Sequence, residues 1–132
     1  MLPDADVVAF ALGVPYAHPF GHRGASHSLL FALLIAMIIA ASERRHFARM
    51  FILGAIVVGS HGILDAFTDG GLGIALLWPF SNDRFFAPWR PIPVAPIGLG
   101  YLSPRGMVVA ATELFYFLPV FAYALWPRRK KE

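Results

Sequence analysis

Three long apolar runs dominate this chain, and they limit it to folds in which helices lie in lipid or pack against one another. The spans that they predict cover about residues 27–42, 50–68 and 107–126. A helix needs about 20 residues to cross the hydrocarbon core of a bilayer. The second and third runs approach this length, whereas the first would need a thinner bilayer or helical neighbours. We therefore expect an all-α integral membrane protein with about three transmembrane helices, forming a single membrane domain over residues 1–132.

The composition agrees with this expectation and excludes several classes of protein. Hydrophobic residues make up 58% of the chain and charged residues only 14%, whereas typical soluble domains are about 25% charged. The chain has no cysteine, so disulfides and thiolate chemistry are excluded. The net charge of +3 is small, and we expect no nucleic-acid partner.

The basic residues predict how the chain is oriented in the membrane. They cluster at residues 44–49 and 128–131, each beside an apolar run. By the positive-inside rule, both clusters face the cytoplasm. The N-terminal residues, the end of the second span and the 69–106 loop then share the outer side of the membrane.

Two segments outside the long runs are less regular. Residues 7–14 are apolar but too short to cross a bilayer. Residues 79–104 hold six of the eleven prolines, and proline interrupts helices. The same stretch contains Phe85, Phe86 and Trp89, and aromatic side chains favour the headgroup region. We expect a short apolar N-terminal segment and a long interfacial loop rich in proline and aromatic residues.

Six side chains that can bind a metal fall on the predicted outer side. His61 and Asp65 lie four residues apart in the second apolar run, so on a helix they share one face. Ionisable groups in such a run are costly and need a partner or a function. The full set of predicted ligands is Asp4, Asp6, His22, His27, His61 and Asp65. Mixed imidazole and carboxylate ligands suit a divalent metal, with zinc as first choice and manganese or iron as alternatives.

Each pair of predicted ligands also has a simpler explanation. The pair in the second run can form a hydrogen bond that stabilises helix packing. His22 and His27 can be polar residues at the membrane interface, although a helix N-terminus would keep His27 neutral, which is the form that binds metal. Asp4 and Asp6 would point the same way in an extended segment, or they can belong to a solvated turn. Ser26 is expected to cap the first long helix.

Charged residues near the predicted ligands are expected to act in catalysis or to brace the structure. Arg23 lies between two of the histidines, and we predict that it steadies negative charge on a substrate. Glu113, about two turns into the third run, is expected to reach the site as a ligand or base, or to pair with an arginine. Arg84 and Arg90 can clamp a phosphate or carboxylate, or can brace the loop together with Asp83.

The order of several short motifs is similar to a known family. The motifs are Pro3-Asp4-Ala5-Asp6, His22-Arg23-Gly24-Ala25-Ser26-His27-Ser28, His61-Gly62-Ile63-Leu64-Asp65 followed by Thr68, Trp78-Pro79-Phe80 and Pro88-Trp89-Arg90-Pro91. Together they resemble the YdjM-like family of small inner-membrane proteins, described as membrane-bound metal-dependent hydrolases, over about residues 3–97. The resemblance implies a multi-pass protein of the bacterial inner membrane, and with the predicted orientation it places the site on the periplasmic side. The positions that match are Asp4, Asp6, His22, Arg23, His27, His61 and Asp65.

These observations lead to one functional hypothesis and leave two others open. In the first, one or two metals activate a water to attack an ester, such as a phosphoester of a lipid or lipid-linked molecule, and Arg23 stabilises the developing oxyanion. The second is a metal-free enzyme of lipid-phosphatase type with a histidine nucleophile. The third is a non-catalytic metal-binding scaffold that engages a partner through the loop. Membrane lipids are expected partners in every case, and a homo-oligomer remains open because three spans are few to enclose a site.

Overall fold

Helices are the regular elements of the described structure, a computed structural model that covers residues 2–96 and 98–126. Among these residues an isolated antiparallel bridge pairs Ile74 with Phe85, and no strand is formed. The predicted all-α class is therefore confirmed for the described part of the chain. The structure divides into two compact units, Met1–Pro91 and Ile92–Glu132, and each is described separately below. The single domain expected from the sequence stays a prediction.

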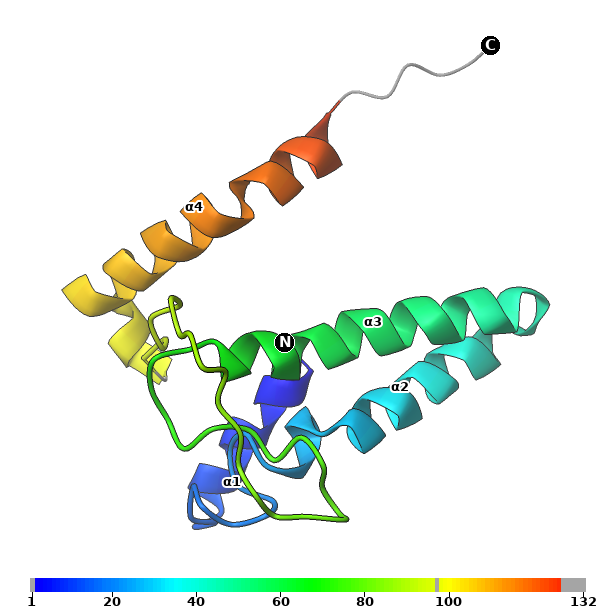
Figure 1. The fold of residues 1–132 in the computed structure, drawn as a ribbon, viewed down its shortest axis with the longest axis horizontal. Helices are drawn as coiled ribbons and strands as arrows, with labels where there is room; N and C mark the ends of the chain where they lie inside the picture. The colour runs from blue at the N-terminus through cyan, green and yellow to red at the C-terminus, as the bar shows by residue number, and fades with distance from the viewer. Residues whose placement is uncertain (1, 97, 127–132) are drawn as a thin grey trace. The chain divides into compact units, whose positions relative to one another are not determined.

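The first unit is built on a pair of antiparallel helices. Its elements are the 3-10 helix η1 (Pro3–Val7), α1 (Val8–Ala11), the 3-10 helix η2 (Ala25–His27), α2 (Leu29–Ser42), the 3-10 turn η3 (Arg44–His46) and α3 (Phe47–Ala66). Figure 1 shows α2 and α3 side by side, joined by the tight turn at one end. The N-terminal segments and the loop that follows α3 gather at the opposite end of the pair (Figure 1).

Small residues line the seam between α2 and α3. Ala32, Ala36 and Ala40 form the buried face of α2. A methyl group added to Gly54 of α3 would come within 3.1 Å of the Cα atom of Ala36, so the two backbones approach closely at this point. Close approach through small residues is how helices pack in a membrane, where van der Waals contact replaces the hydrophobic drive.

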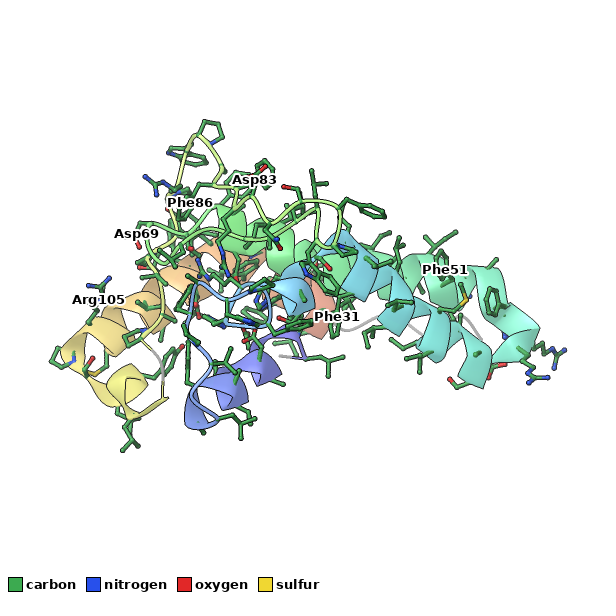
Figure 2. The ribbon with its side chains drawn as sticks, turned by 90° about the horizontal axis from the view of Figure 1, so that it is seen from below. Phe31, Phe51, Asp69, Asp83, Phe86 and Arg105 are labelled. Carbon is green, nitrogen blue, oxygen red and sulfur yellow. The ribbon has the colours of Figure 1, made fainter. Side chains whose placement is uncertain are left out.

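The outward faces of the same two helices are strongly apolar. Exposed side chains there include Leu34, Ile38, Ile52, Ile56 and Val57. Figure 2 shows side chains projecting along the length of the pair, with Phe31 near the start of α2 and Phe51 near the turn end of α3. Soluble proteins rarely expose apolar surface of this extent, so this surface suits contact with lipid.

Two helices of the described structure are long and apolar enough to cross a membrane. They are Arg44–Ala66, which includes α3, and Pro104–Leu125. In contrast, α2 has 14 residues, or about 21 Å at the usual rise per residue, against a hydrocarbon core of about 30 Å. The second and third predicted spans thus form helices of suitable length and character, whereas a crossing by α2 stays a prediction.

The first long helix begins later than the sequence analysis predicts. Ser28 is its N-cap, because the Ser28 hydroxyl oxygen accepts the main-chain N–H of Phe31 at 3.1 Å. The expectation that Ser26 caps this helix was wrong. The Ser26 hydroxyl instead donates to Asp6. His27 consequently precedes α2 and lies in η2, between the N-terminal segment and the helix pair.

A long loop follows α3 and is ordered without helix or strand. Ile74 and Ala75 are buried in it, and Arg84 braces it against the N-terminal segment. The Arg84 guanidinium donates to the main-chain carbonyls of Tyr16, His18 and His22 at 3.1 to 3.2 Å. Bracing is therefore the alternative that these contacts favour for Arg84. Figure 2 shows Asp83 and Phe86 in the same loop, and its position at the membrane interface stays a prediction.

The second unit consists of η4 (Gly98–Leu102) and α4 (Pro104–Leu125). Ser103 caps α4 by accepting the main-chain N–H of Gly106 at 3.2 Å. Within this unit the Tyr101 hydroxyl lies 3.4 Å from Oε2 of Glu113, to which it donates. The participation of Glu113 in a site with the predicted ligands stays a prediction.

Candidate metal centre

The N-terminal segment carries its two aspartates on a 3-10 helix. Asp4 and Asp6 lie in η1, and residues two apart on such a helix point in directions about 120° apart. Of the two conformations that the sequence left open, the structure shows a helical turn and not the extended segment with both carboxylates on one side. As a result the two aspartates reach different nitrogens of the His27 ring.

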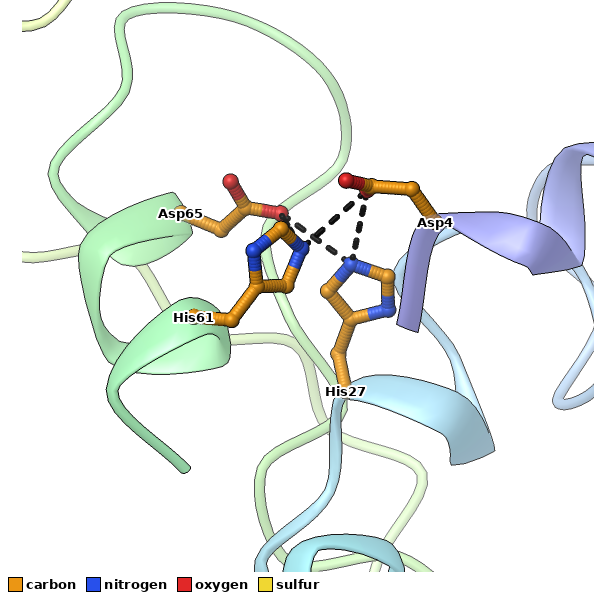
Figure 3. Close-up of side chains that lie close together, drawn as sticks. All are labelled: Asp4, His27, His61 and Asp65. Atoms are coloured by element: carbon orange, nitrogen blue, oxygen red, sulfur yellow. Dashed lines mark hydrogen bonds and ion pairs between the residues drawn. The ribbon is translucent and has the colours of Figure 1, made fainter. Parts of the chain in front are cut away.

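Four of the predicted ligands converge on one point. Their ligand atoms all lie within 4.8 Å of one another, and they come from η1, η2 and α3: Asp4, His27, His61 and Asp65. Nε2 of His61 lies 3.1 Å from Oδ1 of Asp4 and 4.0 Å from Oδ2 of Asp65. Nε2 of His27 lies 3.5 Å and 3.2 Å from the same two oxygens. Figure 3 shows these four side chains pointing toward one another.

These separations match those between the ligands of a small tetrahedral ion. Zinc binds imidazole nitrogen and carboxylate oxygen at about 2.0–2.2 Å, so two ligands of a regular tetrahedron lie about 3.3–3.6 Å apart. The nitrogen–oxygen distances of the cluster, 3.1 to 4.0 Å, straddle that range. The donor set of two imidazoles and two carboxylates also suits zinc, manganese or iron. The residues present therefore fit a divalent metal.

His27 is the central side chain of this cluster. Its side chain is 0% exposed, and its buried Nε2 lies in ion-pair contact with the carboxylates of Asp4 and Asp65 without the geometry of a hydrogen bond. Burial lowers the pKa of His27, but the close carboxylates of Asp4, Asp6 and Asp65 outweigh burial and raise the pKa to about 10. Without a metal, Nε2 of His27 would therefore carry a proton. That proton lies where the surrounding carboxylates favour a positive charge.

The acidic residues of η1 are held in their charged form by the same contacts. Partial burial raises the pKa of Asp4, but hydrogen bonds and charge from His27 and His61 outweigh it and keep that pKa well below the usual range. For Asp6, burial likewise raises the pKa, and hydrogen bonds from His22, His27 and Ser26 bring it down. Both carboxylates are thus available as anions, which is the form that binds metal.

The other predicted ligands form a second group around the opposite side of His27. This group contains Asp6, His22 and His27. Nδ1 of His22 lies 2.6 Å from Oδ1 of Asp6, and Nδ1 of His27 lies 3.2 Å from Oδ2. The main-chain N–H of Arg23 and the Ser26 hydroxyl also donate to Oδ2 of Asp6. The structure thus brings all six predicted ligands together in two groups that share His27.

Arg23 lies beside the cluster and is almost fully buried. Its Nη1 donates to the Thr68 hydroxyl oxygen at 2.8 Å and to the Gly70 carbonyl at 2.9 Å. Its Nε lies 3.4 Å from Oδ2 of Asp65. Its backbone adopts a φ of 61°, which is uncommon for a residue other than glycine. These contacts suit a residue that holds Asp65 and the end of α3 in place, and the predicted role of Arg23 on a substrate oxyanion stays a prediction.

Comparison with known proteins bears on the origin of this arrangement. The model of the family described as YdjM inner membrane protein matches residues 1–130. This chain belongs to the YdjM family. The inner membrane protein YbcI of Escherichia coli (strain K12) is 44% identical over 138 residues, which cover 98% of this chain and 80% of YbcI. No solved structure matches the chain. The YdjM resemblance and the inner-membrane assignment made from the sequence are thus confirmed.

One glycine allows α3 and η2 to approach closely enough for their ligands to meet. A methyl group added to Gly62 would lie 2.6 Å from the main-chain oxygen of His27, closer than real Cβ contacts. Because Gly62 follows His61 directly, it sets how near α3 comes to η2. Only the three-dimensional contact reveals this role of Gly62.

We expect Gly62→Ala to lower the free energy of unfolding by about 1–3 kcal/mol, because the added methyl forces backbone atoms apart. The same change should weaken metal binding although it removes no ligand. Gly59→Ala is the matched control, since its added methyl would lie 3.7 Å from Cβ of Ala32, an ordinary contact. Thermal unfolding and zinc titration of both detergent-purified variants test this. Equal behaviour of the two variants would contradict the expectation.

From the sequence, one further side chain was assigned the wrong role and another was assigned none. Ser26 was expected to cap a helix and instead binds Asp6. Thr68 belongs to the motif that begins at His61, but no partner could be assigned to it until the structure placed its hydroxyl against Arg23. A polar residue three positions after Asp65 was the only signal available in the sequence.

Proposed function

We propose that this YdjM-family protein is a membrane-bound metalloenzyme that hydrolyses an ester. The divalent metal, zinc first and manganese or iron next, would be held by Asp4, His27, His61 and Asp65. The observation that carries the proposal is the convergence of two imidazole nitrogens and two carboxylate oxygens within 4.8 Å, one of them the buried Nε2 of His27, which faces both carboxylates. A cluster of that kind has a high electrostatic cost unless a cation completes it.

The chain's own residues suggest how such a site would work. A divalent metal, when bound, supplies a Lewis acid that lowers the pKa of water toward neutrality. Asp4 is the most exposed of the four side chains, at 38%, so we assign the approach of water and substrate to its side. Arg23 keeps Asp65 oriented, and the buried His27 would bind the metal from the side away from solvent. A phosphoester of a lipid or lipid-linked molecule is the substrate class proposed, because the protein belongs to an inner-membrane family.

A direct experiment is hydrolysis by the detergent-purified protein loaded with zinc, manganese or iron. Phospholipids and polyprenyl phosphates are the substrates to test, with a chelator arm and with His61→Ala alongside. We expect activity that depends on metal and is lost in both arms. Activity that resists the chelator would contradict the proposal and support a histidine nucleophile.

A non-catalytic metal site is the second candidate, and one observation favours it. Four protein ligands complete a tetrahedron, as in structural zinc sites, whereas catalytic zinc sites keep a position open for water. Cobalt substitution separates the two cases. If azide changes the visible spectrum of the cobalt protein, a coordination position on the metal is accessible, which supports the proposed enzyme. If azide has no effect and no ester is hydrolysed, the site is a closed one.

We also propose that the metal ligands face the periplasm, because basic residues at 44–49 favour a cytoplasmic turn. The chain has no cysteine, so single cysteines report on topology without background. We expect Asn82→Cys, in the loop after α3, to react with an impermeant maleimide on intact spheroplasts. Glu43→Cys, in the turn before α3, should react only after permeabilisation. The reverse pattern would contradict the proposed orientation.

A further inference from the structure

The two groups of predicted ligands differ in what their contacts allow. We infer that the cluster holds one metal ion, on the Nε2 side of His27, and that Asp6 is a positioning residue for His27 and no metal ligand. This inference rests on the metal site proposed above and assigns separate roles to residues that the sequence could only group together.

The first argument concerns the proton on the His27 ring. Nδ1 of His27 lies 3.2 Å from Oδ2 of Asp6 and 3.0 Å from the Ser26 hydroxyl oxygen. The Ser26 hydroxyl donates its proton to Asp6. The side of its oxygen that faces Nδ1 of His27 therefore carries a lone pair. Both neighbours of Nδ1 are therefore acceptors, and Nδ1 must carry the proton. The lone pair of the neutral ring is then on Nε2, the atom that faces Asp4 and Asp65.

A second argument removes Asp6 from the ligand set. Nδ1 of His22 and Oδ1 of Asp6 are 2.6 Å apart, which is the length of a strong hydrogen bond. Two ligands about 2.0–2.2 Å from one zinc ion at a right angle or more would lie about 2.8 Å apart at the least. The remaining oxygen of Asp6 already accepts from the Arg23 main chain and from Ser26. This carboxylate is occupied by donors on both oxygens.

The arrangement is that of a carboxylate that supports a metal-binding histidine. Such a partner fixes the tautomer and ring orientation and raises the basicity of the ligand, and its loss typically weakens metal binding about 10- to 100-fold. Asp6 comes from η1, as does the ligand Asp4. The N-terminal segment therefore supplies one ligand and one positioning residue to opposite sides of a single imidazole.

The test is a cobalt titration of the detergent-purified full chain, followed by its visible absorption. We expect wild type to saturate at one equivalent. Asp6→Ala should also saturate at one equivalent, with an affinity about 10- to 100-fold lower. Asp6→Asn keeps an acceptor for Nδ1 of His27 but loses the charge, so its affinity should fall between the two and its cobalt bands should shift. Ser103→Ala, which removes the cap of α4, serves as a control for lowered stability alone and should bind like wild type.

Each outcome bears on a different part of the account. Two equivalents in wild type and one in Asp6→Ala would make Asp6 a ligand and overturn this inference, while a metal site would stand. One equivalent with equal affinity in wild type and Asp6→Ala would overturn the positioning role. No binding in wild type would contradict the proposed function itself.

Discussion

Asp65→Ala and His61→Ala are each expected to weaken zinc binding by about 60- to 700-fold. Structural zinc sites of four ligands provide about 10–16 kcal/mol of binding free energy, so one ligand contributes about 2.5–4 kcal/mol. Both residues lie on one face of α3, and their ligand atoms belong to the converging group of four. Competition titration with a fluorescent zinc chelator measures the change directly.

The matched control for this prediction is Asp69→Ala. Asp69 lies four residues after Asp65, and a longer helix would place it on the same face. Since α3 ends at Ala66, Asp69 falls outside both groups of converging residues. We expect Asp69→Ala to bind zinc like wild type. A loss in Asp69→Ala as large as in Asp65→Ala would show that the effect comes from acidic charge in general and would contradict the assigned site.

Arg23→Ala is expected to lower the free energy of unfolding by about 3–5 kcal/mol, because it removes one buried member of the charged network around Asp65. Arg23 is 4% exposed, and its guanidinium also binds Thr68 and Gly70. Zinc affinity should fall as well, since Asp65 loses the group that orients it. Unfolding in a titration from mild detergent into SDS, followed by circular dichroism, gives the stability.

Arg90→Ala is the control for the loss of an arginine as such. Arg90 is exposed, and its guanidinium lies 4.7 Å from the centre of the Phe86 ring, a contact that contributes about 0.5–1 kcal/mol at an exposed site. We expect its removal to change stability little and zinc affinity not at all. If Arg23→Ala were no more destabilised than Arg90→Ala, the bracing role of Arg23 would be wrong.

The helices and one pair of ligands followed from the sequence because their signals are local. The apolar runs predict α3 and α4, and the spacing of His61 and Asp65 follows from helix geometry. A charged pair inside an apolar run drew attention because its burial needs compensation. These properties depend on residues a few positions apart, which a single chain displays directly.

The other features of the site could not be predicted from the sequence, because they depend on contacts between distant segments. Whether Asp4 and Asp6 share a side depends on η1, and the sequence carried too few residues there to separate a 3-10 turn from an extended strand. The role of Ser26 depends on a carboxylate 20 residues away. The partition of the six predicted ligands into two groups depends on the orientation of one ring, that of His27. Such information exists only once the chain is folded.

X-ray absorption spectroscopy of the zinc-loaded wild-type protein tests the central claim most directly, namely that Asp4, His27, His61 and Asp65 bind one metal. We predict a first shell of four nitrogen and oxygen atoms at about 2.0–2.2 Å, the outer-shell scattering of two imidazole rings, and no metal–metal distance. A spectrum without imidazole scattering, or with a second metal within about 4 Å as in two-metal sites, would contradict this account.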